Sequence, residues 1–226
     1  MADVDTGTEP SAIGILGGTG DQGRGLARRL ALAGHRIVLG SRSEERATAA
    51  AEGLTTAEPR LLVTGGSNAD AARCGDLAII AVPYEGHRAL LAGLAEPLAG
   101  RIVIDCVNPL GFDSRGAYPL RIAEGSAAEE AAAVLPGSTV VAAFHHVSAV
   151  QLLDRERAEV DTDVLVLGDD RPATERVVAL ASSIAGMRGI FAGRLRNAGQ
   201  VEALTANLIA VNRRYKAHAG IRITDL

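Results

Sequence analysis

The chain has 226 residues, of which 47% are hydrophobic and only 3% aromatic, and its formal net charge is −4 at pH 7. This length allows one large domain, or one domain with a small appendage, and the core must be built of Ala, Val, Leu and Ile. An acidic chain without a cluster of Lys and Arg among aromatic residues indicates no nucleic-acid surface. No apolar run reaches the length of a membrane span, so we expect no membrane contact.

Residues 1–11 are polar and acidic and contain Pro10. A secretory signal would need a basic start followed by an apolar stretch, so we expect a disordered tail and a cytoplasmic protein. The two cysteines, Cys74 and Cys106, form neither a CxxC motif nor a disulfide framework. We expect both to be small buried hydrophobic residues in a reducing compartment.

The first predicted strand, Ile13-Gly14-Ile15-Leu16, leads into a glycine-rich turn and then into a helix with apolar residues at i, i+3, i+4 and i+7 from Gly23. A GxGxxG motif between a strand and a helix is typical of dinucleotide binding. Its glycines permit the tight turn, the approach of backbone N–H groups to a pyrophosphate, and close packing of the helix on the strand. The alternative is a turn that binds no ligand. We predict that the pyrophosphate lies on Gly18, Thr19, Gly20, Asp21, Gln22 and Gly23.

The second strand is predicted at residues 36–40, after a helix that ends near Gly34. An NAD site needs an Asp or Glu at the tip of this strand, but Ser41 and Arg42 stand there, and Arg46 follows one helical turn later. A hydroxyl and two guanidinium groups suit a 2′-phosphate, which favours NADP over NAD. The alternative is an ordinary charged helix start, with Glu44 and Glu45 in its first turn.

Further strands and helices alternate along the chain. Strands are predicted at residues 61–63, 76–82, 101–106 and 139–144, and helices at 46–52, 67–72 and 85–95. The strand at 76–82 is almost entirely apolar, as expected for a parallel sheet that is covered on both faces. This order predicts an α/β fold with a Rossmann-like, doubly wound parallel sheet and right-handed connections.

Ligands bind at the carboxyl ends of the strands in such sheets. The loops that follow the fourth, fifth and sixth strands are Pro83–His87, Asn108–Gly111 and His145–Ser148. We expect these loops to converge beside the glycine turn and to form the active site. Two alternatives stay open: Tyr84 can be a surface residue, and Asn108-Pro109 can be a plain turn. Otherwise Asn108 would hold the nicotinamide amide or an oxygen of the second ring system.

His145 and His146 are adjacent, and on extended backbone their side chains would point to opposite faces, so we assign no metal. A general acid or base role is chemically possible because histidine titrates near neutrality. A wall of the pocket, an orienting hydrogen bond and a structural role are the alternatives for His145.

Residues 111–125 contain Pro119 and three glycines, and we expect a loop that is either a lid or a surface insertion. From residue 149 the pattern predicts a small C-terminal α/β extension, with strands at 163–167 and 188–191, a helix that Pro172 opens, and a last helix at 198–216. The last helix has a broad apolar stripe that can pack on the domain, wall the site or meet a second subunit. We therefore divide the chain into a dinucleotide-binding domain at 12–148 and a smaller part at 149–226 that contributes to the site and to a dimer contact.

Several of these motifs resemble those of the F420-dependent NADP oxidoreductases. The resemblance rests on Gly17–Gly23, Gly40-Ser41-Arg42, Ala81–Glu85, Asn108–Leu110, Ala143–Val147 and Gly220-Ile221-Arg222. It implies hydride transfer between nicotinamide C4 of NADP(H) and C5 of the deazaflavin coenzyme F420, in a homodimer. The cofactors carry this chemistry, and the protein sets distance and orientation, so we assign no catalytic residue.

The resemblance also implies the remaining site residues. The deazaflavin would contact Tyr84, Asn108, Pro109, Leu110, His145 and Val147, and the NADP-binding set would extend to Val82, Pro83, Gly86, Gly111 and Ala149. Members of this family need not have a histidine at the position of His146, so the resemblance implies no proton-transfer role for it. Two rival functions are an NADP-dependent reductase of another substrate and a non-enzymatic NADPH sensor.

Overall fold

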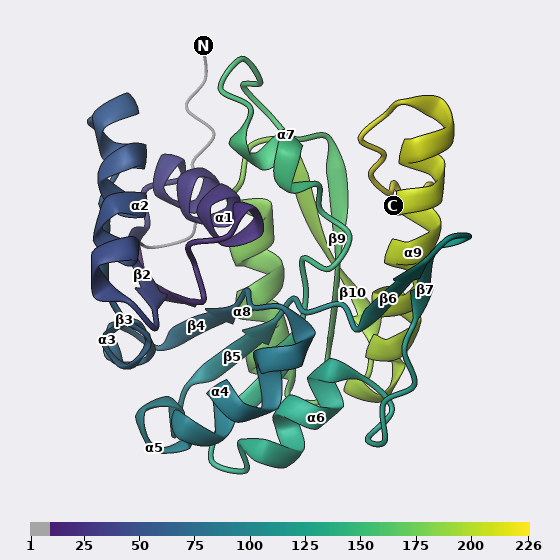
Figure 1. The fold of residues 1–226 in the computed structure, drawn as a ribbon, viewed down its shortest axis with the longest axis horizontal. Helices are drawn as coiled ribbons and strands as arrows, with labels where there is room; N and C mark the ends of the chain where they lie inside the picture. Colours follow the sequence, from purple (N-terminus) through teal and green to yellow (C-terminus); the bar gives the residue numbers. More distant parts are fainter. Residues whose placement is uncertain (1–9) are drawn as a thin grey trace.

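The computed structural model describes residues 10–226, and most of the expected tail lies outside them. One eight-stranded sheet runs through the molecule in the order β10-β9-β8-β5-β4-β1-β2-β3 (Figure 1). Every neighbouring pair is parallel except β8 and β9. The strands are β1 Ala12–Leu16, β2 Arg36–Ser41, β3 Val63–Ser67, β4 Leu77–Ile80, β5 Ile102–Asp105, β8 Thr139–Ala142, β9 Thr162–Gly168 and β10 Met187–Gly193.

Helices cover both faces of this sheet (Figure 1), which confirms the predicted α/β, doubly wound arrangement. The helices are α1 Asp21–Leu32, α2 Glu44–Ala57, α3 Asn68–Arg73, α4 His87–Gly93, α5 Ala95–Leu98, α6 Ala127–Val134, α7 Ala149–Leu153, α8 Arg171–Ser182 and α9 Ala198–Tyr215, with short 3₁₀ turns at η1 Tyr84–Gly86 and η2 Leu195–Asn197. In the described part of the chain, none of them is long and apolar enough to cross a bilayer.

Several predicted elements differ in extent from the structure, most clearly the third strand and the helix before it. The third strand begins rather than ends at Val63, because β3 pairs with β2 from Ile37↔Val63 to Ser41↔Ser67. Its glycines resemble a turn in the sequence, but a Cβ at Gly65 would lie 2.3 Å from the Ala47 carbonyl carbon, so the strand needs glycine to pack against α2. The helix predicted at 46–52 is longer in the structure, where α2 runs over Glu44–Ala57.

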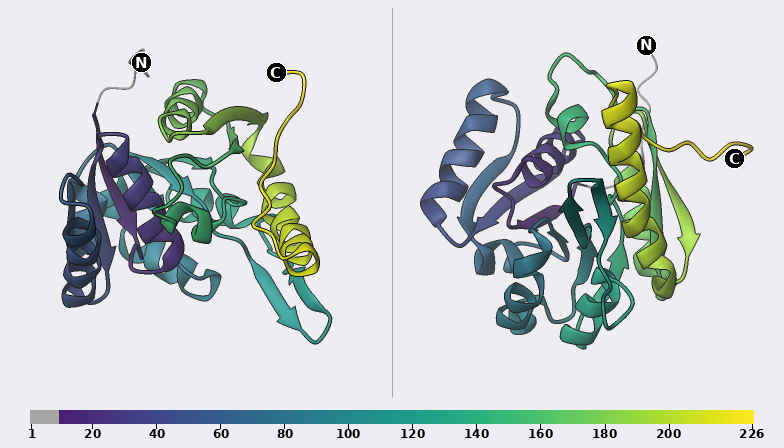
Figure 2. Two further views of the ribbon diagram at one scale, coloured as in Figure 1. Left: turned by 90° about the horizontal axis from the view of Figure 1, so that it is seen from above. Right: turned by 45° about the vertical axis from the view of Figure 1, so that its right-hand side comes forward.

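Residues 111–125 are not the irregular loop that we expected. Strands β6 Leu110–Asp113 and β7 Gly116–Pro119 form an antiparallel hairpin, which projects from the body of the molecule beside α9 (Figure 2). Ser114 and Arg115 form the turn between the two strands, and Gly116, with a φ of 122°, begins β7 directly after it. Of the residues from which we predicted a loop, Gly111 lies within β6, Gly116 and Pro119 begin and end β7, and Gly125 lies beyond the hairpin.

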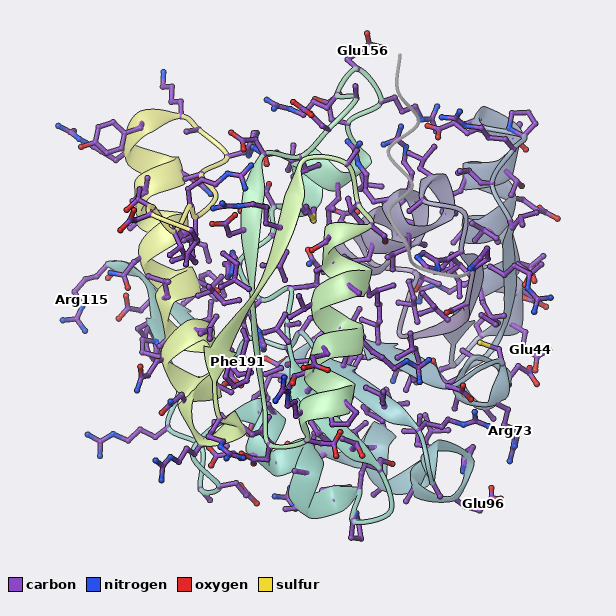
Figure 3. The ribbon with its side chains drawn as sticks, turned by 180° about the vertical axis from the view of Figure 1, so that it is seen from behind. Glu44, Arg73, Glu96, Arg115, Glu156 and Phe191 are labelled. Carbon is purple, nitrogen blue, oxygen red and sulfur yellow. The ribbon has the colours of Figure 1, made fainter. Side chains whose placement is uncertain are left out.

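The C-terminal part continues the same sheet. The antiparallel contact of β8 with β9 is short and joins Val141 to Gly168 and Ala142 to Leu167. Residues 12–148 and 149–226 therefore share one sheet. From behind, α8 crosses the face beside β10, which carries the exposed Phe191 (Figure 3).

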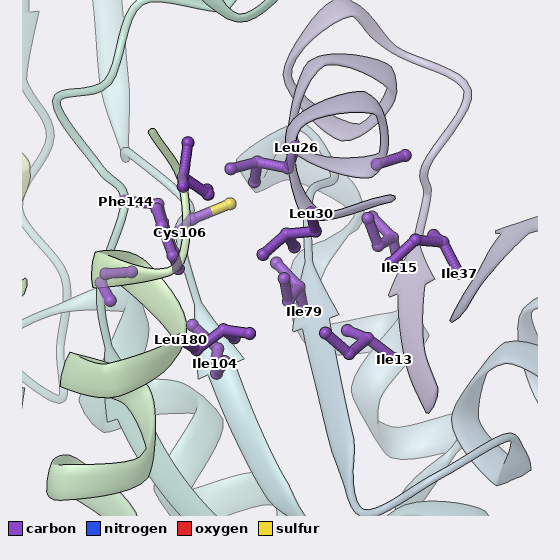
Figure 4. Close-up of a cluster of buried hydrophobic side chains, with 14 of the residues drawn as sticks. Ile13, Ile15, Leu26, Leu30, Ile37, Ile79, Ile104, Cys106, Phe144 and Leu180 are labelled. Atoms are coloured by element: carbon purple, nitrogen blue, oxygen red, sulfur yellow. The ribbon is translucent and has the colours of Figure 1, made fainter. Parts of the chain in front are cut away.

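Each face of the sheet has its own core. On one face Ile13, Ile15, Ile79 and Ile104 pack against side chains of α1, α2 and α8 such as Leu26, Leu30 and Leu180 (Figure 4). On the other face the alternate strand residues, such as Leu16 and Ile80, pack against α3, α4, α5, α6 and α9. This alternation fixes every strand's register, and so it fixes which loops meet at the carboxyl edge.

A buried carboxylate anchors the C-terminal arm, which contains the Gly220-Ile221-Arg222 motif. Asp163 on β9 accepts hydrogen bonds from Arg188 at 2.7 Å, from Arg222 at 2.6 Å and from the Ile223 N–H at 2.6 Å. The Arg188 hydrogen bond outweighs the effect of burial and holds the pKa of Asp163 far below its ordinary value. Arg222 also pairs with Asp161, which lies at the surface.

We expect Asp163→Asn to lower the free energy of unfolding by about 3 kcal/mol, because it leaves two guanidinium groups without their buried partner. Asp161→Asn is the matched control and should cost less than about 1 kcal/mol, because its pair is exposed. The pKa of Asp163 is lowered on folding, so its contribution is present above the unfolded pKa of about 4 and is lost as pH falls. Urea unfolding at pH 7 and pH 3 measures this, and equal losses for the two variants would contradict it.

Candidate functional site

The start of α1 is pressed against the end of β1. A Cβ at Gly23 would lie 2.6 Å from the Cα of Gly18, and one at Gly18 would lie 2.6 Å from Leu39 Cδ2. The Gly18 N–H donates to the Gly40 carbonyl at 2.9 Å, which joins the turn to β2. No side chain larger than hydrogen fits between helix and strand here, as the GxGxxG spacing predicts.

The turn leaves several backbone donors free. Among the described residues, nothing accepts a hydrogen bond from the N–H groups of Thr19, Gly20, Asp21 or Gln22. A Cβ at Gly20 would meet no atom within 4 Å. Unpaired N–H groups at the start of a twelve-residue helix, next to open space, are the donor set that a phosphate group needs. The residues present therefore fit a pyrophosphate.

Two arginines follow the end of β2, one directly after the strand and one in the first turn of α2. Ser41 ends the strand and is mostly buried, and its hydroxyl accepts from the Ser43 N–H at 3.2 Å. Arg42 and Arg46 are exposed, and neither forms an ion pair with any residue in the described part of the chain. The Ser43 hydroxyl caps α2 by accepting from the Arg46 N–H at 3.3 Å, so Arg46 lies in the first turn. This corner offers a hydroxyl and two free guanidinium groups, which fit a 2′-phosphate.

The loops after β4, β5 and β8 lie together because these strands are neighbours in the sheet. The Asn108 amide donates to the His145 carbonyl at 2.8 Å. Thr205 on α9 lies 3.3 Å from both the Asn108 Oδ1 and the His145 carbonyl oxygen. Both polar atoms of Asn108 are thus engaged in holding the two loops together. Our sequence analysis did not single out Thr205, because on α9 it considered only the apolar stripe.

We expected His145 and His146 to lie on extended backbone, but in the structure both lie in a turn. The preceding residue, Phe144, has a left-handed φ of 64° and is fully buried. Its carbonyl accepts from the Gln22 side chain at 3.3 Å, which ties this loop to the start of α1. The turn at Phe144 brings both histidines inward, and each is less than 5% exposed.

The two imidazoles differ in their hydrogen bonds. Neither ring nitrogen of His145 has a partner among the described residues, whereas His146 Nε2 accepts from the Leu165 N–H at 3.4 Å. Burial lowers the pKa of each histidine to about 4, so both rings are neutral at pH 7. Buried polar atoms are nearly always paired, so the two His145 nitrogens, which are shielded from solvent and have no partner among the described residues, are an exception. They do not indicate a proton donor at neutral pH.

A buried cluster behind these loops was not predicted. His87 at the start of α4 is fully buried, with Nε2 2.7 Å from Asp105 Oδ2 and Nδ1 2.8 Å from Glu130 Oε1. The Tyr84 hydroxyl lies 3.4 Å from Glu130 Oε2. Burial lowers the pKa of His87, but the hydrogen bonds and charges of the two carboxylates outweigh it and raise the pKa to about 8. The contact joins β5, α4 and α6, which are far apart in sequence, so no local motif marks it.

The other predicted residues lie along the same edge or in the hairpin. Val82 and Tyr84 are half-buried, Pro83 and Gly86 are exposed, Pro109 and Val147 are buried, and Ala149 begins α7. Leu110 and Gly111 belong to β6. Two hollows of about 500 and 560 Å³ lie elsewhere, one between α1, α2 and residues 153–155 and one between the hairpin and α9. Neither contains a predicted site residue, so the site is defined by polar groups at the sheet edge.

Comparison with known proteins places the chain in a family. Residues 12–109 match the family model described as NADP oxidoreductase, coenzyme F420-dependent. The F420-dependent NADP reductase of Methanothermobacter marburgensis is 42% identical over 221 residues, which cover 95% of this chain and 98% of that protein. The chain belongs to the F420-dependent NADP reductase family.

A second curated reductase and a solved structure are also similar to this chain over most of its length. The F420-dependent NADP reductase of Methanocaldococcus jannaschii is 42% identical over 222 residues, with 95% of this chain and 98% of that protein covered. A crystal structure of a putative F420-dependent NADP reductase from Arthrobacter sp. FB24 superimposes with a TM-score of 0.79 at 28% identity and covers 94% of this chain and all of that one. The family model ends before β6, whereas these relatives span the C-terminal part as well.

We expect the His145 and His146 imidazoles to stay neutral in the folded protein down to about pH 5. Their pKa values of about 4 lie below the unfolded value of 6.5, so the unfolded state binds more protons between these limits and stability falls as pH decreases through them. NMR titration of the histidine ring protons, assigned with His145→Gln and His146→Gln, measures both values. A folded-state pKa above 6 for either ring would contradict this.

Proposed function

We propose that this protein is an oxidoreductase that transfers a hydride between NADP(H) and coenzyme F420. Two features together carry the proposal. The N–H donors at the start of α1 find no acceptor within residues 10–226, and Arg42 and Arg46, which follow β2 where an NAD site would have an acid, form no ion pair there. The choice of F420 rests on membership of the family, whose named relatives match 95% of the chain.

In this proposal each part of NADP(H) has its own protein groups. The N–H groups of Thr19–Gln22 hold the pyrophosphate, and Ser41, Arg42 and Arg46 hold the 2′-phosphate. The nicotinamide end of the nucleotide would lie near Val82, Pro83 and Gly86. Gly111 and Ala149, in the neighbouring segments, would complete the NADP-binding set. Bound NADPH supplies the hydride, and the chain's contribution is to orient it and exclude water.

The substrate side is formed by the loops after β4, β5 and β8. Tyr84 and Leu110 are half-buried and offer apolar surface for a flat deazaflavin. Pro109, Val147 and the neutral imidazole of His145 are buried within the loops on this side. Asn108 contributes by fixing the His145 backbone at 2.8 Å. Because the cofactors carry the chemistry, these residues raise the rate by holding the reacting carbons close and aligned.

The direct test mixes the protein with NADPH and oxidised F420 and follows the visible absorbance of the deazaflavin. We expect the band to bleach, and to bleach far more slowly when NADH replaces NADPH. Protein that binds NADPH but leaves F420 unreduced would contradict the proposal and favour a reductase of another substrate. Absence of turnover with every acceptor, together with an oligomeric state that changes with NADPH, would favour a sensor.

Arg42→Ala should weaken NADPH binding by about 1.5–3 kcal/mol, the range for a charged hydrogen bond, while NADH binding stays nearly unchanged. Titration calorimetry with each nucleotide measures this difference. Arg73→Ala is the control, because Arg73 lies on α3 and pairs with Glu96 at the surface (Figure 3). An equal loss for NADPH and NADH would show that Arg42 does not contact the 2′-phosphate.

We further propose that two copies associate through α9 and the β6–β7 hairpin, and that the protein works in the cytoplasm. Tyr215 is 73% exposed, Phe112 is 69% exposed, and Val211 lies on the same helix as Tyr215. Exposed apolar side chains gathered in one region indicate an interaction surface. The molar mass in solution tests the association, and the mass of a single chain at micromolar concentration would contradict it.

A further inference from the structure

A buried acid–imidazole–acid contact lies directly behind the loops that we assign to F420. His87, Asp105 and Glu130, which we call the charge cluster, have side chains that are 0%, 0% and 6% exposed. With both carboxylates ionised each can only accept, so both ring nitrogens of His87 donate, as they do in the imidazolium form. The cluster then holds one positive and two negative charges, with both acids at hydrogen-bond distance.

The charge cluster holds two of these loops in place. Glu130 accepts from the Tyr84 hydroxyl at 3.4 Å, and the Tyr84 ring lies parallel to the His87 ring within 30° at a centroid distance of 6.1 Å. The second oxygen of Asp105 accepts from the Val107 N–H at 2.9 Å, which fixes the backbone immediately before Asn108. One imidazolium therefore links the loop after β4 to the loop after β5.

Neighbouring elements complete the cluster. Arg88 contacts Glu130 at 3.2 Å and also Glu124, which lies in the segment before α6. Glu202 on α9 accepts from the N–H groups of Ala127 and Ala128 at 3.0 and 3.2 Å, so it fixes the start of α6, the helix that carries Glu130. Thr205, one turn later on α9, contacts Asn108. The same helices thus hold the cluster and the loops.

We infer that His87 is a positioning residue whose imidazolium, held between Asp105 and Glu130, sets Tyr84 and Asn108 for the F420 ring. This inference rests on the proposed function, because it names what the two loops present to F420. His87 is fully buried and does not touch the substrate. Its effect passes through Glu130 to Tyr84 and through Asp105 to the Val107 N–H.

Protonation of His87 gives this inference a pH signature. The groups that face the cluster are Tyr84 from η1, Arg88 from α4, Cys106 after β5, Glu124 before α6, His145 after β8 and Glu202 from α9. The pKa of His87 is raised to about 8 on folding, so its stabilising contribution is complete below the unfolded value of about 6.5 and is lost as pH rises through about 8. Above that pH two buried carboxylates face a neutral ring, and the loops lose their fixed arrangement.

Two variants test the inference without removing the imidazole. Tyr84→Phe keeps the ring and deletes one hydrogen bond, so kcat/KM for F420 should fall about threefold to tenfold, while the Kd for NADPH stays constant. Glu130→Gln keeps the side-chain shape and removes one charge, which lowers the pKa of His87. The alkaline limb of the kcat/KM profile should therefore move from near pH 8 to lower pH. Glu175→Gln is the matched control, since Glu175 pairs with Arg171 at the surface of α8.

NMR titration of the His87 ring in the protein without F420 gives a readout that is independent of turnover. Its pKa should match the alkaline limb in the wild type and shift with it in Glu130→Gln. If the wild type reduces F420 and both variants keep its F420 kinetics and its pH profile, the inference is overturned and the proposed function is not. Failure of the wild type to reduce F420 would overturn the proposed function and, with it, the role of these loops. If Glu130→Gln does not fold, Tyr84→Phe and the wild-type titration decide.

Discussion

The contact between Gly18 and Gly23 determines how the rest of the site is arranged. With 2.6 Å between the Gly18 Cα and a Cβ built at Gly23, α1 lies directly on β1 and begins at the carboxyl edge of the sheet. Four N–H groups at its start consequently find no acceptor among the described residues, and the space next to Gly20 is open. The Gln22 side chain reaches from the same turn to the Phe144 carbonyl, so the position of α1 also sets the loop that carries His145.

Polar contacts, rather than apolar packing, hold the substrate-side loops to one another. Asn108 and Thr205 hold the His145 backbone, and the charge cluster of His87, Asp105 and Glu130 holds Tyr84 and the backbone before Asn108. Such contacts are directional, so they define loop positions more narrowly than hydrophobic burial does. The C-terminal part of the chain contributes Glu202 and Thr205 to this arrangement, although it lies beyond the dinucleotide-binding motifs.

The sequence predicted those features that depend on local spacing. The glycine turn and the order of strands and helices could be read from adjacent residues, and the structure confirms them. The hairpin at residues 110–119 was missed because its glycines and Pro119 equally suit a loop. The charge cluster was missed because its members lie 18 and 25 residues apart along the chain, and only the sheet order brings them together. The left-handed Phe144, which turns both histidines inward, has no local sequence signal.

A crystal structure with both NADP⁺ and F420 bound would test the account most directly. We expect the pyrophosphate oxygens about 3 Å from the N–H groups of Thr19–Gln22, the 2′-phosphate between Arg42 and Arg46, and the reacting carbons about 3–3.5 Å apart beside Tyr84 and His145. Phosphates bound away from the start of α1, or a deazaflavin that does not contact the loops after β4, β5 and β8, would contradict it.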